Sequence, residues 1–383
     1  MQLSPGLYIR RNHPKKNNLK GRIILMGLKK GAFSFSRFGV SSPLPGNFAD
    51  LFDEKIKSFA FRDFFPENEE KSLGWTGLQE ILDTEFAYAA HTLGDYRVFS
   101  LRIDRKTTPS ALLRLRFLEA ERGMLAERET KKLYKEEREA LRESIRQDMM
   151  KQAHPVPSML DVCWSLTKGM IYFSSHAEKI LQDFQDFFRE TFEMDLALHV
   201  PWLDALGQSK EDAEEFLSRQ PGREFLTWLW FKSEERNGRI ALEGQEEIGL
   251  AFVRRLILES GEGDYAESVV CQGQHALLLE GKEAIRQGKK IREARLSLEI
   301  DSMEWEFTFK ADLFQFQSMK LPAPTEESDE NSALEEEGRL LERIFLLEKA
   351  IETMDQLFTF FMGLRLSAAW PAEVARMERW MNR

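Results

Sequence analysis

Apolar side chains in the first half of the chain switch between the spacing of a strand and the spacing of a helix. An apolar residue at every second position predicts a half-buried strand, whereas apolar residues three and four positions apart predict an amphipathic helix. The expected elements are strands at 31–40 and 96–103, a β-hairpin at 160–174 and helices at 48–61 and 176–192. The segment SLGWTG at Ser72–Gly77 is interpreted as a turn around Trp75.

The second half of the chain is expected to contain mostly strands. The segment FLTWLWF at Phe225–Phe231 alternates and favours a strand. Further strands are expected at 251–258, 269–279, 290–300, 305–309 and 314–319, with a short helix at 281–287 and a long amphipathic helix at 334–366. Helices and hairpin-connected strands in this order predict an α+β fold with antiparallel sheets and long helices.

Composition divides the chain into regions and bounds the class of protein. The first expected region is an N-terminal extension at 1–25, whose composition favours disorder. It is followed by an α+β region with a long basic helix at 26–203, a second α+β region with a strand meander at 204–320, an acidic linker at 321–333 and a C-terminal helical region at 334–383. No apolar run reaches the roughly 18–20 residues that a membrane span needs, so no membrane partner is expected. The two isolated cysteines, Cys163 and Cys271, favour a reducing cytoplasm.

The segment 109–151 contains no proline after Pro109 and is rich in helix-forming residues, which predicts one long helix, or two with a break near Gly123. Six of its cations are three or four residues apart, so on a helix they fall within an arc of roughly 80° and form a ridge about 27 Å long. These cations are Arg128, Lys131, Lys135, Arg138, Arg142 and Arg146, with Lys132 just outside the arc and Arg114 earlier in the segment. Such a ridge suits the phosphates of a polyanion. The same spacing is typical of a solvated helix with ion pairs such as Glu127 with Lys131, and both interpretations stay open.

The net charge of the whole chain bears on whether this ridge can bind nucleic acid. The net charge is −10, which repels nucleic acid, so a nucleic-acid role requires segregated charge. Residues 102–151 carry 14 basic and 10 acidic side chains, and residues 282–295 carry six basic and two acidic ones. The second stretch adds Arg286, Lys289 and Lys290 as candidate phosphate contacts. Two separate basic patches in an acidic protein favour nucleic-acid binding.

The sequence offers little for catalysis or metal binding. The six histidines are scattered without metal-ligand spacing, so neither a metal nor a cofactor is expected. A Mg²⁺-dependent nuclease, or a nuclease subunit, would need clustered carboxylates, and Glu304, Glu306 and Asp312 are the best candidates. The same residues are typical of the solvated face of a hairpin. A protein–protein scaffold built on the charged helix is a third hypothesis.

The order of several segments resembles the recombination-associated RdgC family of bacteria. These segments are Gly74-Trp75, RKTTPSALL at Arg105–Leu113, the basic helix with KKLYKEEREALRESI, the hairpin CWSLTKGMIYFSS and the late stretch GKEAIRQGKKIREARLSLEIDSMEWEFTFKADLFQFQSMKL. They extend from about Met26 to Leu366. The chain departs from shorter members of the family in its residues 1–25, in an expanded middle near 204–265 and in its acidic linker.

The resemblance implies a function without implying catalytic residues. Family members are α+β proteins that form a ring-shaped homodimer with a basic central hole. They bind duplex DNA with little sequence preference and restrain recombination driven by RecA, which makes RecA a candidate partner. By this resemblance the chain is expected to be a cytoplasmic, nucleoid-associated and non-enzymatic DNA-binding protein whose two basic patches face the DNA.

Overall fold

The computed structural model describes residues 27–63, 69–86, 91–128, 132–202, 216, 218–235, 238–242, 247–260, 267–273, 276–323 and 333–382. The first half contains β1 (Phe33–Val40), α1 (Phe48–Ser58), β2 (Lys71–Gly77), β3 (Thr92–Leu93), β4 (Tyr96–Arg105), α2 (Ser110–Glu127), α3 (Lys135–Gln152), β5 (Val156–Ser165), β6 (Met170–Phe173), α4 (Glu178–Phe192) and β7 (Leu196–Leu198). The second half contains α7 (Pro221–Glu234), β8 (Arg239–Ile240), β9 (Ile248–Ser260), β10 (Glu267–Gln272), α8 (Ala276–Arg286), β11 (Lys290–Ile300), β12 (Met303–Lys310), β13 (Gln315–Lys320), α9 (Ala333–Arg365) and α10 (Trp370–Met381). The expected extension at 1–25 and most of the expected linker at 321–333 lie outside the described residues.

The strands join into one sheet that runs through the whole molecule. Its order is β10-β9-β11-β12-β13-β1-β6-β5-β4-β2, and neighbouring strands along it are antiparallel. Strand β1 connects the two halves, because Phe33 and Phe35 pair with β13 while Ser36–Gly39 pair with β6. The mixture of helices and antiparallel sheet confirms the predicted α+β class, and the sheet crosses the expected boundary at residue 203.

Buried side chains line both faces of the first half of the sheet. Helices α1 and α4 pack on one face, where Phe52, Phe99, Trp164 and Phe188 belong to one buried cluster. Val98, the neighbour of Phe99 on β4, belongs instead to the cluster on the opposite face, as the alternation of side chains along a strand requires. The periodic residues of the two helices therefore supply one face of this core.

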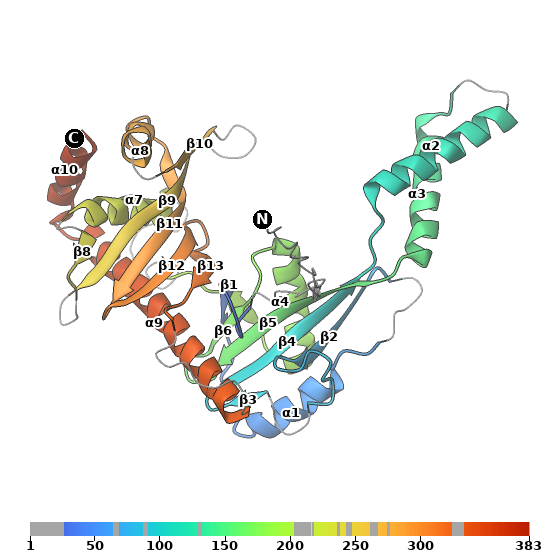
Figure 1. Ribbon diagram of the computed structural model, residues 1–383, viewed down its shortest axis with the longest axis horizontal. Coiled ribbons are helices and arrows are strands. Elements are labelled where there is room, and N and C mark those ends of the chain that lie inside the picture. The colour runs from blue at the N-terminus through green and yellow to red at the C-terminus, as the bar shows by residue number, and fades with distance from the viewer. Residues whose placement is uncertain are drawn as a thin grey trace, which may run out of the picture.

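Helix α9 ties the two halves of the molecule together. The Glu348 carboxylate accepts hydrogen bonds from the hydroxyls of Tyr96 and Tyr172 in the first half. The indole of Trp305, on β12, donates to the Leu346 carbonyl at 3.0 Å. Figure 1 shows α9 running between the strands of the first half and those of the second half. The long amphipathic helix predicted at 334–366 is confirmed, and its apolar face packs within the same chain.

Two sequence predictions about local structure are wrong. The segment Ser72–Gly77 is part of strand β2 and pairs with β4 along its length. Its glycine serves close packing, since a Cβ at Gly74 would lie 2.2 Å from the Cα of Phe61. The segment Phe225–Phe231 is helical and belongs to α7. The helix lies between the sheet and helices α9 and α10, and its apolar residues are buried on every side. A helix buried all round lacks the one-sided apolar pattern by which a surface helix is recognised in a sequence, and this is why the sequence pattern predicts a strand.

One element boundary in the second half also differs from the sequence predictions. The strand expected at 269–279 ends at Gln272, and α8 begins at Ala276. Helix α10 begins at Trp370, inside the helical region predicted at 334–383, and packs against α7 and α8. The predicted strands at 31–40, 290–300, 305–309 and 314–319 are confirmed as β1, β11, β12 and β13.

Candidate nucleic-acid interface

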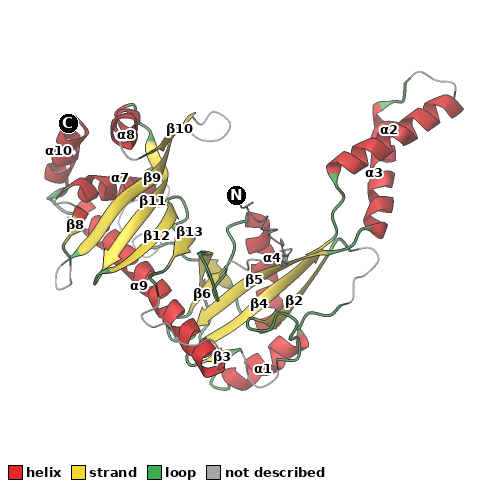
Figure 2. Ribbon diagram, viewed as in Figure 1, coloured by secondary structure: helices red, strands yellow, loops and turns green. Residues whose placement is uncertain are grey.

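Helices α2 and α3 form an antiparallel pair, here called the arm, that projects from the end of the sheet (Figures 1 and 2). The arm leaves the sheet where β4 ends and β5 begins, at the paired residues Arg105 and Val156. Among the described residues of the arm, only Leu113 and Leu133 are buried hydrophobic side chains. The arm therefore has almost no core of its own and exposes most of its surface.

The turn of the arm corrects the prediction of a continuous basic ridge. Gly123 lies inside α2, with no atom within 4 Å of a Cβ built there, and the chain turns between Arg128 and Tyr134 instead. Helix α3 begins where the Glu137 carboxylate accepts a hydrogen bond from the Tyr134 backbone N–H at 3.0 Å. That bond, followed by the one from Arg128, lowers the pKa of Glu137. An acidic residue in the first turn of a helix is favourable both as a cap and toward the helix dipole.

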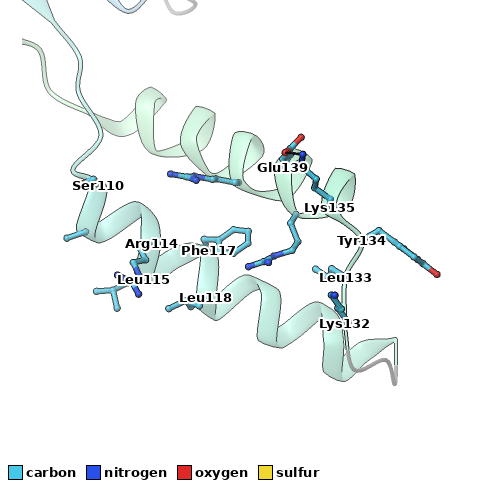
Figure 3. Close-up of a pocket in the computed structure, with 13 residues that line it drawn as sticks. Ser110, Arg114, Leu115, Phe117, Leu118, Lys132, Leu133, Tyr134, Lys135 and Glu139 are labelled. Atoms are coloured by element: carbon cyan, nitrogen blue, oxygen red, sulfur yellow. Dashed lines mark ion pairs between the residues drawn. The ribbon is translucent and has the colours of Figure 1, made fainter. Parts of the chain in front are cut away.

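The fold brings together cations that lie far apart in the sequence. A groove of about 1600 Å³ lies between α2 and α3, and five candidate phosphate contacts line it. They are Arg114 of α2, Lys132 of the turn and Lys135, Arg138 and Arg142 of α3. Figure 3 shows side chains from both helices and the turn around this groove. The candidate Lys131 lies outside the described residues.

The cations of the arm differ in whether a carboxylate already neutralises them. Arg138 is paired with Glu121 at 2.8 Å and its guanidinium lies 5.5 Å from the Phe117 ring centroid. Arg128 is paired with Glu137, Lys135 with Glu139, and Arg146 with Glu143 and Glu70. Arg114, Lys132 and Arg142 are exposed and have no ion-pair partner within the part of the chain that the structure describes. These three side chains, here called the free arm cations, carry charge that is available to a ligand.

The groove also carries exposed apolar side chains. Leu115 is 63% exposed, Leu118 48% and Tyr134 81%. All three line the groove beside the cations. Such a mixture can contact both the phosphates and the apolar sugar faces of a nucleic acid, because nucleic-acid surfaces present both.

The second basic patch is engaged in contacts within the chain. Lys289 is buried and paired with Glu267 at 3.0 Å, and Lys290 donates to the Arg219 carbonyl at 2.7 Å. Arg286 is paired with Glu283 at 3.0 Å. Figure 1 places α8 and β11 at the opposite end of the molecule's long axis from the arm. The prediction that both patches face one opening concerns the dimer and stays a prediction.

The carboxylates considered for a nuclease site are held by separate partners. Glu306 is paired with Arg295 and Lys320, and burial, which raises its pKa, is outweighed by the hydrogen bonds from these two cations, so the pKa is lowered. Asp312 is paired with Arg223 and Arg292. Across the described ranges, no three His, Cys, Asp or Glu side chains lie in an arrangement that could hold a metal ion.

Sequence reasoning missed a second group of unpaired cations, Arg254 and Arg255 on β9. Both are exposed, and among the residues that the structure describes neither has a carboxylate partner. The signal in the sequence is the pair itself, because FVRRLIL places two adjacent charges inside an otherwise alternating strand.

Comparison with known proteins relates part of the chain to a protein family. Residues 37–202 match the family model RdgC, which is described as "Putative exonuclease, RdgC". No curated protein sequence matches the chain. None of the described helices combines the length and apolar character needed to cross a membrane. The matched range begins within β1, ends after β7 and contains the whole arm, so the chain resembles the RdgC family over the half of the molecule that carries the candidate nucleic-acid interface.

Proposed function

We propose that this protein binds duplex DNA without reading its base sequence, in a role related to recombination. The observation that carries the proposal is the set of free arm cations, gathered from two helices and a turn around one groove. The match to the RdgC family over residues 37–202 supports the recombination-related role. The acidic remainder of the chain would keep nonspecific binding away from other surfaces.

The physical basis of the proposed binding is the release of counterions from DNA. Each phosphate that a lysine or arginine neutralises lowers the slope of log affinity against log salt by about 0.9. Contacts to phosphates position a protein on the duplex but carry no sequence information. Exposed cations on a projecting helix pair suit this kind of binding, since their side chains can reach the phosphates that line the grooves of the DNA duplex.

The proposal extends to a homodimer that encircles the duplex and restrains strand exchange by RecA. The RdgC resemblance supports this extension, and so does the way the arm projects from the body of the molecule (Figure 1). A protein that surrounds the duplex would occupy the DNA that RecA must engage. Direct contact with RecA is not required for this effect. A cytoplasmic, nucleoid-associated location follows from the same proposal.

Fluorescence anisotropy with a labelled duplex at several salt concentrations tests the proposal. The triple variant Arg114→Glu, Lys132→Glu and Arg142→Glu is expected to lose at least tenfold in affinity at low salt. The matched control replaces Lys30, Arg62 and Arg379 with Glu, since these exposed cations also lack a described partner and lie outside the arm. Equal losses in both triple variants, or no binding by the wild type, would overturn the assignment of the arm.

A nuclease activity is the competing function, because the matched family model carries the description "Putative exonuclease, RdgC". We propose instead that the protein is not an enzyme, since Glu306 and Asp312 are neutralised by different arginines. Purified protein incubated with end-labelled linear duplex and Mg²⁺ is expected to leave the DNA intact. Degradation that disappears in Glu306→Gln or Asp312→Asn would establish the nuclease and refute the non-enzymatic proposal.

A further inference from the structure

Strand β9 contains a bulge opposite Arg295 of β11. Ala294 pairs with Leu256 and Leu296 pairs with Phe252, so the single residue Arg295 faces the three residues 253–255. Within this bulge Arg254 has a φ of 62°, in the left-handed region that residues other than glycine seldom adopt. Bulges of this kind re-aim side chains and are frequent beside functional sites.

The bulge places two adjacent arginines on the same side of the sheet. In an unbroken strand Arg254 would share the inward face of Leu256 and Leu258, which are buried. The extra residues turn Arg254 outward, and Arg255 is exposed beside it. A non-glycine residue in the left-handed region is strained and persists where the surrounding structure holds it in place.

The two arginines line a hollow of about 450 Å³ on the open face of the sheet, here called the bulge site. Arg295 of β11 and Lys320 of β13 supply two further cations, and Thr308 and Gln317 supply a hydroxyl and an amide. The bulge site therefore draws its donors from four strands of one rigid sheet.

The charges of the bulge site do not cancel. Its carboxylates are Glu293 and Glu306, against four cations. Glu306 is already paired with Arg295 at 2.9 Å and with Lys320 at 3.2 Å, and Arg295 also donates to Thr308 and to the Ser318 carbonyl. Arg254 and Arg255 are the cations left without a described partner.

We propose that the bulge site binds a phosphate group, held by the guanidinium groups of Arg254 and Arg255. A guanidinium presents parallel N–H donors that match phosphate oxygens, and two of them side by side can neutralise a dianion. Arg295 also lines the hollow, where hydrogen bonds to Glu306 and to the Thr308 hydroxyl hold its side chain in place. The phosphate could belong to a free phosphate ester or to the DNA backbone, and both sources offer the same chemistry to the site.

The ligand probe is pyrophosphate, titrated calorimetrically into the full-length protein in a low-salt buffer without phosphate. The test variant is Arg254→Asn with Arg255→Ala, because asparagine tolerates the left-handed backbone better than other residues. It is expected to bind pyrophosphate at least tenfold more weakly than the wild type. The control variant Arg62→Ala with Arg379→Ala removes the same charge elsewhere and is expected to bind normally. A normal circular dichroism spectrum and melting temperature show that the test variant is folded.

A second variant, Arg254→Lys with Arg255→Lys, keeps both positive charges but removes the parallel N–H donors of the guanidinium groups. Its affinity for pyrophosphate is expected to lie between those of the test variant and the wild type. Absence of pyrophosphate binding in the wild type, or equal binding by wild type and test variant, would overturn the bulge site. The same variants in the duplex-binding assay identify the source of the phosphate. A loss with both ligands assigns the site to the DNA backbone, and a loss with pyrophosphate alone assigns it to a free ester.

The bulge site and the arm can fail independently. If the wild type binds no duplex but pyrophosphate binding still depends on Arg254 and Arg255, the DNA-binding function falls and the bulge site stands. If the free arm cations govern duplex binding while the test variant binds pyrophosphate as the wild type does, the DNA-binding function stands and the bulge site is refuted.

Discussion

The Nε of Arg138 on α3 lies 2.8 Å from Oε1 of Glu121 on α2, and this ion pair joins the two helices of the arm. The same guanidinium lies over the Phe117 ring. Arg138 is thus both a candidate DNA contact and part of what holds the arm together. Arg142 lies one turn further along α3. It is exposed and has no ion-pair partner among the described residues.

This difference predicts unequal effects for two neighbouring arginines on DNA binding. Arg142→Ala is expected to reduce the steepness of log affinity against log salt by about 0.9, the value for one lost phosphate contact. Arg138→Ala is expected to change it less, because Glu121 already neutralises that charge. Anisotropy titrations between about 50 and 200 mM salt measure both slopes. A larger change for Arg138 would show that the ion pair opens when DNA binds.

Removing the acidic partner is expected to act in the opposite direction. Glu121→Gln releases the charge of Arg138 and removes a negative charge near the groove, so duplex affinity should rise a few fold at low salt. The cost in unfolding free energy should be on the order of 1 kcal/mol, because the Arg138 side chain is half exposed even though Glu121 is largely covered. Glu378→Gln on α10 is the control for loss of one negative charge away from the arm. Unchanged or weaker binding by Glu121→Gln would contradict the prediction.

Close packing at Gly74 predicts a strong effect on stability. An alanine Cβ there would meet the backbone of Phe61 at 2.2 Å, and overpacking of this kind costs typically about 1–3 kcal/mol or more. Gly39→Ala on β1 is the matched control, since nothing lies within 4 Å of its Cβ. Urea denaturation should show a large loss for Gly74→Ala and a change within about 1 kcal/mol for Gly39→Ala.

A buried carboxyl predicts part of the pH dependence of stability. Burial raises the pKa of Asp161 above its ordinary value of 3.8, against hydrogen bonds from the Leu28 N–H and the Ser100 hydroxyl, which lower it. Since the folded-state pKa lies above the unfolded one, the fold favours the protonated form, and stability is lost as the pH rises from 3.8 through the raised pKa.

The variant Asp161→Asn keeps a hydrogen-bond acceptor for Leu28 without the charge. It is expected to be at least as stable as the wild type at neutral pH, and this advantage should shrink as the pH falls toward the ordinary aspartate pKa of 3.8. Urea denaturation of both proteins across this pH range measures the difference. An advantage that grows toward acidic pH would reverse the assigned sign.

The junction between the two halves of the molecule depends on a buried arginine. Arg37 of β1 donates to Asp355 of α9 at 2.7 Å, and its guanidinium lies 5.2 Å from the Phe314 ring centroid. Asp355→Leu alone leaves this charge unpaired and is expected to cost more than about 2 kcal/mol. The double variant with Arg37→Met should cost less than Asp355→Leu alone, as measured by urea denaturation. Additive losses would show that the pair is not coupled.

Local patterns in the sequence were enough to predict much of the fold. The period-two segments at β1, β11, β12 and β13 and the helical period of α9 are confirmed, because one face of each is buried and the other is not. The same reasoning failed for α7, whose apolar residues are buried all round. It also failed at Gly74, where a glycine reports a close approach to Phe61 rather than a turn.

The amino-acid sequence alone defines which cations the basic segment contains and how strongly that segment favours a helix. The tertiary structure decided which of them are available, because that depends on the turn between Arg128 and Tyr134 and on carboxylates brought from elsewhere in the chain. Arg114 thereby joins Arg142 around one groove, whereas Lys289 is neutralised by Glu267. The bulge that exposes Arg254 likewise depends on pairing with β11. Charge is a local property of a residue, but its neutralisation is set by neighbours in space.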